Sequence, residues 1–143
     1  MKKKLHFIIA AILVTIFIFS NSLQDAANST QQSDVFVDAV VNTVKDVGID
    51  VKRSGVEHIV RKCAHFVEFA IQGLFITLCF DVPFKKRLYR VLPAGFLTAC
   101  TDEFIQLFSN GRAAMLQDIF IDTAGCLAGF LAIWFIYAKR RCA

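Results

Sequence analysis

The chain has 143 residues and a formal net charge of +4, and 56% of its residues are hydrophobic, including 15 phenylalanines. This composition is too apolar for a small soluble core, and the length suits one domain, which we expect to span residues 1–143. The lysines and arginines cluster at the edges of apolar stretches, which is typical of membrane orientation rather than nucleic-acid binding. We therefore predict an integral membrane protein with no nucleic-acid partner.

Four apolar stretches follow one another along the chain, at about 5–20, 64–80, 88–108 and 119–138. Each is close to the ~20 residues that a membrane-spanning helix needs. They predict an all-α membrane protein, a bundle of four transmembrane helices. The first stretch is also compatible with a signal peptide, but no clear A-x-A cleavage site follows it, which favours a retained anchor.

Basic residues at the ends of the apolar stretches predict their orientation. They lie at 2–4, at 85–90 and at 139–141. The positive-inside rule places all three clusters in the cytoplasm, together with both termini. The segment 21–63 and the loop 109–117 are then expected outside.

The outer segment 21–63 is expected to contain a short amphipathic element. Residues 20–34 are polar and predict turns, whereas valines recur afterwards at helical spacing, at Val37, Val40, Val41, Val44 and Val47. We expect these valines to form a helix on the outer membrane surface that ends at Gly48. A further helix is predicted to begin near Ser54 and to continue into the second span.

The second span carries charged residues, although a charge at the bilayer centre costs about 2.5–3.5 kcal/mol. At 100° per residue its polar side chains share one face: His58, Arg61, Lys62, His65, Glu68 and Gln72. The other spans also carry polar residues toward their outer ends: Ser20 and Gln24 after the first, Asp102, Glu103 and Gln106 in the third, and Asp118 and Asp122 in the fourth. Arg112 lies in the outer loop. This pattern predicts one polar cluster that faces other helices near the outer surface.

We expect this cluster to be the functional site. Its main members are Lys62, His65, Glu68, Asp102, Glu103, Gln106, Arg112 and Asp118, and its secondary members are Ser20, Gln24 and Asp122. The carboxylates would set a net negative charge, the cations would balance it or clamp an anionic group, and His65 would make it sensitive to pH. The alternative is structural, with ion pairs that lock the bundle. A functional role is favoured because buried charges cost free energy that apolar packing would avoid.

Small residues and cysteines have simpler interpretations. Gly125 and Gly129 form a G-x-x-x-G pattern, which predicts close packing of the fourth helix within the chain or, alternatively, against a second chain. The five cysteines form no C-x-x-C pair, so neither a disulfide framework nor a zinc site is predicted, and we expect them to behave as small buried hydrophobic residues. We expect no metal and no cofactor.

The polar residues resemble those of the VanZ-like family of bacterial membrane proteins over nearly the whole chain. The resemblance begins at the end of the first span, with Phe19-Ser20, Gln24 and residues 29–33. It continues with the K-x-x-H-F-x-E pattern at 62–68, then with Asp102-Glu103, Gln106, Gly111-Arg112, Asp118 and Gly125 in that order. The sequence departs from the family at Phe69, Asn110 and Asp122, where tyrosine, proline and asparagine are common. The resemblance implies a multi-pass protein of the bacterial cytoplasmic membrane. The family's namesake is linked to resistance to teicoplanin, a glycopeptide antibiotic, but a family name does not supply a reaction.

Three classes of function are compatible with these observations. The favoured one is a non-enzymatic envelope protein whose outer pocket binds a cell-wall precursor, a lipid headgroup or an envelope protein. The second is a membrane enzyme in which His65, Glu68 and the carboxylates perform acid–base or metal-assisted chemistry, although no H-E-x-x-H or G-x-S-x-G motif is present. The third, a small transporter, is disfavoured because the cytoplasmic halves of the spans lack polar residues.

Overall fold

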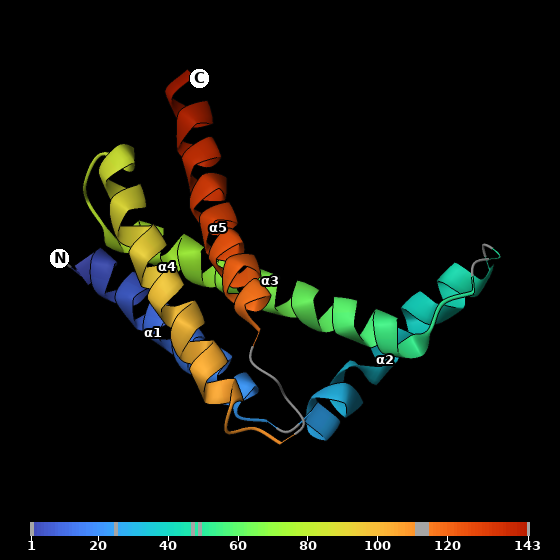
Figure 1. Ribbon diagram of the computed structural model, residues 1–143. Helices are drawn as coiled ribbons and strands as arrows, with labels where there is room; N and C mark the ends of the chain where they lie inside the picture. Colours follow the sequence, from blue (N-terminus) through green and yellow to red (C-terminus); the bar gives the residue numbers. More distant parts are fainter. Residues whose placement is uncertain (1, 25, 47, 49, 111–114, 143) are drawn as a thin grey trace.

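The computed structural model describes residues 2–24, 26–46, 48, 50–110 and 115–142. Within these ranges the chain is helical and contains no strand, which confirms the predicted all-α class. The helices are α1 (Lys2–Ser22), α2 (Ala26–Asp46), α3 (Arg53–Cys79), α4 (Phe84–Gln106) and α5 (Leu116–Cys142) (Figure 1).

Three segments among the described residues are long and apolar enough to cross a membrane, namely Lys4–Ser22, Arg53–Cys79 and Leu116–Arg140. They coincide with the first, second and fourth predicted spans. Helix α4 forms where the third span was expected, but it does not qualify by composition. Basic residues occupy its first turns and Asp102 and Glu103 its last, which leaves only 91–101 uncharged between them.

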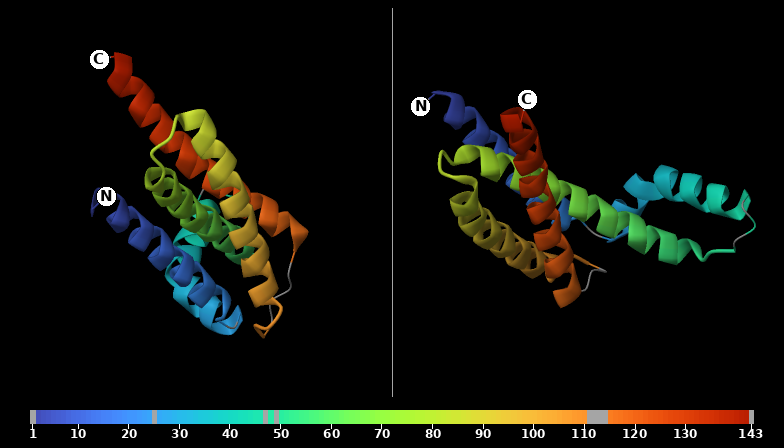
Figure 2. Two further views of the ribbon diagram at one scale, coloured as in Figure 1. Left: turned by 90° about the vertical axis from the view of Figure 1, so that its left-hand side faces the viewer. Right: turned by 90° about the horizontal axis from the view of Figure 1, so that it is seen from above.

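Helices α1, α4 and α5 gather around the C-terminal half of α3, whereas α2 folds back along the N-terminal half of α3 and projects from the bundle (Figures 1 and 2). The Lys4 ammonium lies 2.9 Å from a carboxylate oxygen of Asp81, in the connection between α3 and α4. The ring centroids of Phe84 and Tyr137 lie 5.3 Å apart and join the start of α4 to the end of α5. The start of α1, the α3–α4 connection and the end of α5 therefore share one end of the bundle, as alternating spans require.

Exposed apolar side chains cover the outside of the bundle. On α1, Ile12 is 54% exposed, Leu13 is 60% exposed and Phe17 is 55% exposed. A contiguous apolar surface of this kind suits contact with lipid chains. The interior face of α1 is different, because Ile18 is buried against Phe69 of α3.

The segment between α1 and α3 is more helical than the sequence predicted. The prediction of turns over 20–34 is wrong from Ala26 onward, because α2 begins there and continues to Asp46. Tertiary packing overrides the local preference of these polar residues: Val37 and Val41 are buried against Val56 of α3. The apolar face that we expected on the membrane surface thus packs in part on α3.

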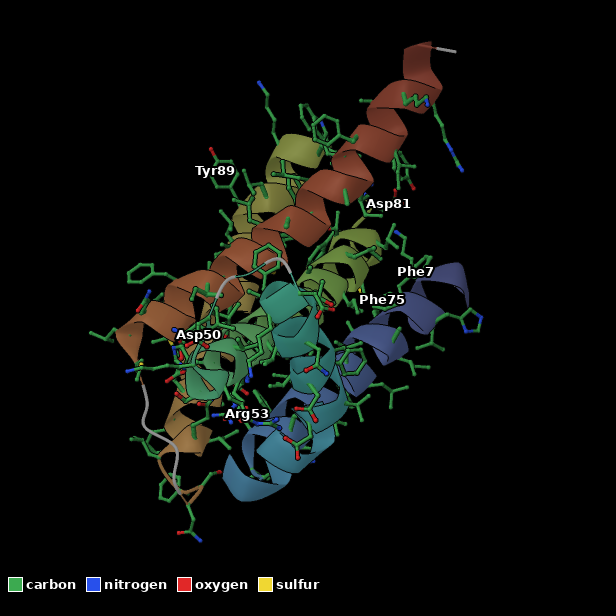
Figure 3. The ribbon with its side chains drawn as sticks, turned by 90° about the vertical axis from the view of Figure 1, so that its right-hand side faces the viewer. Phe7, Asp50, Arg53, Phe75, Asp81 and Tyr89 are labelled. Carbon is green, nitrogen blue, oxygen red and sulfur yellow. The ribbon has the colours of Figure 1, made fainter. Side chains whose placement is uncertain are left out.

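Arg53 of α3 joins α3 to α2 through ion pairs at the polar edge of their contact. Its guanidinium lies 2.6 Å from Asp34 and 3.0 Å from Glu57, and it also pairs with Asp38. Figure 3 views the molecule from the side of this pair, with Asp50 and Arg53 at its near end and Asp81 beyond them. Helix α3 is 27 residues or about 40 Å long. Its N-terminal half packs against α2, and its C-terminal half packs within the bundle.

Glycines allow α5 to cross α3 at very short range. A Cβ atom added at Gly129 would lie 1.9 Å from the carbonyl oxygen of Ala70, and one at Gly125 would lie 2.4 Å from that of Phe66. No side chain fits there without moving a backbone, so α5 is fixed against α3 by direct backbone approach. This crossing lies next to His65 of α3 and one turn from Asp122 of α5.

The expectation that all cysteines are buried is wrong for Cys63, which is exposed, while Cys126 is buried. Cys79 and Cys100 are partly buried.

Candidate functional site

A pocket of about 200 Å³ opens among α3, α4 and α5. It is lined by His58, Arg61, Lys62, His65, Glu103, Gln106, Met115, Asp118, Ile121 and Asp122. The lining changes character with depth, since His58 is exposed and Arg61 and Lys62 are partly exposed, whereas Glu103 and Asp122 are buried. The deepest charged groups of the pocket are therefore carboxylates, whereas its cations lie toward solvent together with Asp118.

Lys62 of α3 forms an ion pair with Asp118 in the first turn of α5. Both side chains are mostly covered, at 19% and 25% exposed. This pair neutralises one carboxylate and one cation, and it joins the two helices at the side of the pocket.

Asp102 of α4 is fully buried beside His65 of α3. One of its carboxylate oxygens, Oδ2, lies 3.7 Å from Nδ1 of His65. The same oxygen accepts a hydrogen bond of 2.9 Å from Nε2 of Gln106, one turn further along α4. The amide of Gln106 thereby fixes the orientation of the Asp102 carboxylate.

Glu103 connects α4 to the start of α5. Its Oε2 accepts a 2.7 Å hydrogen bond from the backbone N–H of Met115, directly before α5 begins. A carboxylate at a helix N-terminus is favourable because the free N–H groups there carry partial positive charge.

Asp122 is the most unusual member of the pocket. It is 1% exposed, and neither of its carboxylate oxygens has a hydrogen-bond partner among the described residues. One of these oxygens lies within 4.8 Å of both an Asp102 oxygen and a ring nitrogen of His65, which themselves lie within that distance of each other. An unpaired buried carboxylate is costly, so this group of three side chains is the place in the pocket where a cation would be held.

Two polar residues of α3, Glu68 and Gln72, bond to neighbouring helices outside the pocket. Asn21 donates a 2.9 Å hydrogen bond to Oε1 of Glu68. Gln72, one turn deeper and 1% exposed, donates to Oγ1 of Thr15 at 2.9 Å and to Oγ1 of Thr98 at 3.2 Å. The single polar face of α3 thus divides into a part that lines the pocket and a part that joins α3 to α1 and α4.

The predicted site residues therefore have different positions. Lys62, His65, Glu103, Gln106, Asp118 and Asp122 line the pocket, Asp102 lies directly beside it, and Glu68 lies on the α1 side. Ser20 is exposed and donates to the carbonyl of Ile16 in its own helix, and neither Ser20 nor Gln24 lines the pocket. Arg112 lies outside the described residues.

Sequence reasoning missed the polar face of α1. The side chain of Ser109 donates a 2.6 Å hydrogen bond to the carbonyl oxygen of Ser22, and Nε2 of Gln106 lies 3.5 Å from the Ser22 hydroxyl. Thr15, Ile18 and Ser22 recur at spacings of three and four, so helical periodicity would have identified this inward face.

A family model described as VanZ/LLP1 matches residues 7–137, nearly the whole chain. No curated protein and no solved structure matches it. The matched range includes every residue that lines the pocket.

Proposed function

This chain belongs to the VanZ/LLP1 family, and on that premise we propose that it is a four-span protein of the bacterial cytoplasmic membrane whose pocket opens on the outer side. The fourth span would be α4, whose Asp102 and Glu103 are only 0% and 4% exposed and so avoid lipid. Its basic residues lie at the opposite end, where long side chains reach water. With the three basic clusters at the cytoplasmic end, the pocket faces outward.

We propose that the pocket binds the polar headgroup of a lipid-linked envelope component such as a cell-wall precursor. The observation that carries this proposal is the mixed lining, with Arg61, Lys62 and Asp118 partly exposed and the carboxylates of Glu103 and Asp122 buried. Arg61 and Lys62 suit the phosphate of such a headgroup, while Glu103 and Asp118 suit its hydroxyl or amine groups. A site in the outer leaflet would meet headgroups without removing the lipid from the bilayer.

Binding of a wall precursor would alter how glycopeptide antibiotics reach their target. We therefore propose that this protein lowers sensitivity to teicoplanin. The support for this step is family membership together with the expected outward position of the pocket.

The test compares two ion pairs at opposite ends of the bundle. The double variant Lys62→Gln/Asp118→Asn removes the pocket pair and leaves no unpaired partner, whereas Lys4→Gln/Asp81→Asn removes an exposed pair far from the pocket. Binding of a lipid-linked wall precursor to protein in lipid nanodiscs should weaken by about tenfold in the pocket variant, the equivalent of about 1.4 kcal/mol. The control variant should bind like the wild type.

The teicoplanin inhibitory concentration should follow the same order in a sensitive host at equal membrane abundance. Equal precursor binding by both double variants would contradict the proposed site. A pocket variant that binds the precursor more weakly but leaves the inhibitory concentration at the wild-type value would reject the antibiotic step alone.

The group His65, Asp102 and Asp122 favours a second candidate, an enzyme that acts on the same headgroup. A histidine beside buried carboxylates suits proton transfer near neutral pH. Incubation of the wild type with the precursor, followed by mass spectrometry of the lipid, would reveal a product that a His65→Gln variant fails to form. An unchanged lipid would reject the enzymatic function.

A further inference from the structure

We propose that His65, Asp102 and Asp122 together bind one divalent cation of the zinc or manganese class at the buried side of the pocket. The sequence led us to expect no metal, because it contains no local ligand motif. The three side chains come from α3, α4 and α5, so their proximity depends on the fold. The site lies in the pocket of the proposed function but does not depend on headgroup binding.

The first observation is the state of Asp122. Its side chain is 1% exposed, and both carboxylate oxygens are without a hydrogen-bond partner in the described part of the chain. Removal of a carboxylate from water without compensation costs several kcal/mol, so such groups pair, coordinate a metal or become protonated. Lys62 is already engaged with Asp118 and does not compensate Asp122.

The second observation is the geometry of the donors. A ring nitrogen of His65 and one oxygen from each aspartate lie within 4.8 Å of one another. Ligands of a tetrahedral zinc ion lie about 3.3 Å apart, so rotations that bring these atoms together by at most about 1.5 Å would complete the site. The short crossing of Gly125 over Phe66, next to His65 and one turn from Asp122, holds the two helices in place for such a site.

The surroundings support a metal centre rather than an accidental cluster. Gln106 donates to the same Asp102 oxygen that faces His65, which is the kind of contact that orients a metal ligand. One imidazole and two carboxylates suit zinc through the nitrogen and manganese through the oxygens. Three protein ligands leave a position for water or for an oxygen of a bound headgroup.

The test is metal analysis of the purified full-length protein. The wild type is stripped with chelator, reloaded separately with Zn²⁺ and with Mn²⁺, desalted and analysed by mass spectrometry. We expect about one ion per chain for one of the two metals, and at least an about tenfold loss of retained ion for Asp122→Asn. The matched control is Asp50→Asn, the same change at an exposed position away from the pocket, which should retain the ion.

Two results would overturn the proposal. The first is a wild type that retains neither metal. The second is equal retention by Asp122→Asn and the wild type, which would show adventitious binding elsewhere. If Asp122→Asn does not fold, as judged by circular dichroism and gel filtration, His65→Gln takes its place and the wild-type stoichiometry still decides. Because no lipid is present in this experiment, its failure is separate from failure of the proposed headgroup binding.

Discussion

The two ends of the bundle differ in the burial of their charged side chains. At the pocket end, Asp102, Glu103 and Asp122 are buried among helices. At the other end, Lys4 and Asp81 form an ion pair with side chains 45% and 76% exposed. Burial of charge is costly, whereas an exposed pair costs little and stabilises little.

Arg87 illustrates how the second end satisfies its charges. Its guanidinium donates to the carbonyl oxygens of Val82 at 2.8 Å and Thr77 at 3.3 Å, and it lies 4.5 Å above the ring of Phe84. Through these contacts Arg87 binds carbonyl oxygens at the end of α3 and in the α3–α4 connection. A structural role therefore accounts fully for this charge. At the pocket end, neither carboxylate oxygen of Asp122 has a hydrogen-bond partner among the described residues, and this is one reason why we propose the functional site there.

The largest expected effect comes from the helix crossing that positions the pocket. Gly129→Ala would place a Cβ 1.9 Å from the carbonyl oxygen of Ala70, which forces α5 away from α3 and should cost about 1–3 kcal/mol or more. Thermal unfolding in detergent should show a clear decrease in melting temperature. Gly55→Ala is the control, because a Cβ there meets nothing within 4 Å and should stabilise the helix slightly. Equal melting temperatures for both variants would contradict the tight crossing.

Helix positions and the polar face of α3 could be predicted from sequence because they depend on local periodicity. The separation of Glu68 and Gln72 from the pocket could not, since it depends on where α1 packs. Asp122 was given only a secondary place, because its missing hydrogen bonds become visible only when three helices are assembled. The length of α2 was underestimated because packing against α3 stabilises this helix more than the helix propensity of its polar residues does.

An intermediate effect is expected from the link between α3 and its neighbours. Gln72→Met keeps the volume but removes the hydrogen bonds to Thr15 and Thr98, and should cost about 1 kcal/mol. The measurement is again unfolding in detergent. Gln117→Met, at an exposed position, should have no effect. A stable Gln72→Met protein would show that the polar face on the α1 side is dispensable.

Arg87→Gln should have a comparable or smaller effect, about 1 kcal/mol, because it removes a charged donor and its contact with Phe84. Lys86→Gln is the control on the exposed side of the same turn. Headgroup binding should be unchanged in Arg87→Gln, since the residue lies at the opposite end. Loss of headgroup binding in Arg87→Gln would contradict the proposal that only the pocket end binds the ligand.

The smallest effect is a pH dependence at Asp81. The hydrogen bond from Lys4, assisted by its charge, lowers the pKa of the Asp81 carboxyl below its ordinary value of 3.8. The resulting stabilisation is fully present above that ordinary value and is lost as the pH falls through the lowered pKa of the folded state. Melting curves of the wild type and Asp81→Asn should therefore converge at low pH. A difference that grows as the pH falls would contradict the pair.

The central claim, that the pocket end faces outward, is tested most directly by labelling at two exposed positions. In a background without native cysteines, Asp50→Cys reports the α2–α3 connection and Asp81→Cys reports the α3–α4 connection at the other end of α3 (Figure 3). We predict that a membrane-impermeant maleimide labels Asp50→Cys in intact cells and labels Asp81→Cys only after permeabilisation. The reverse pattern would place the pocket in the cytoplasm and contradict the proposed function.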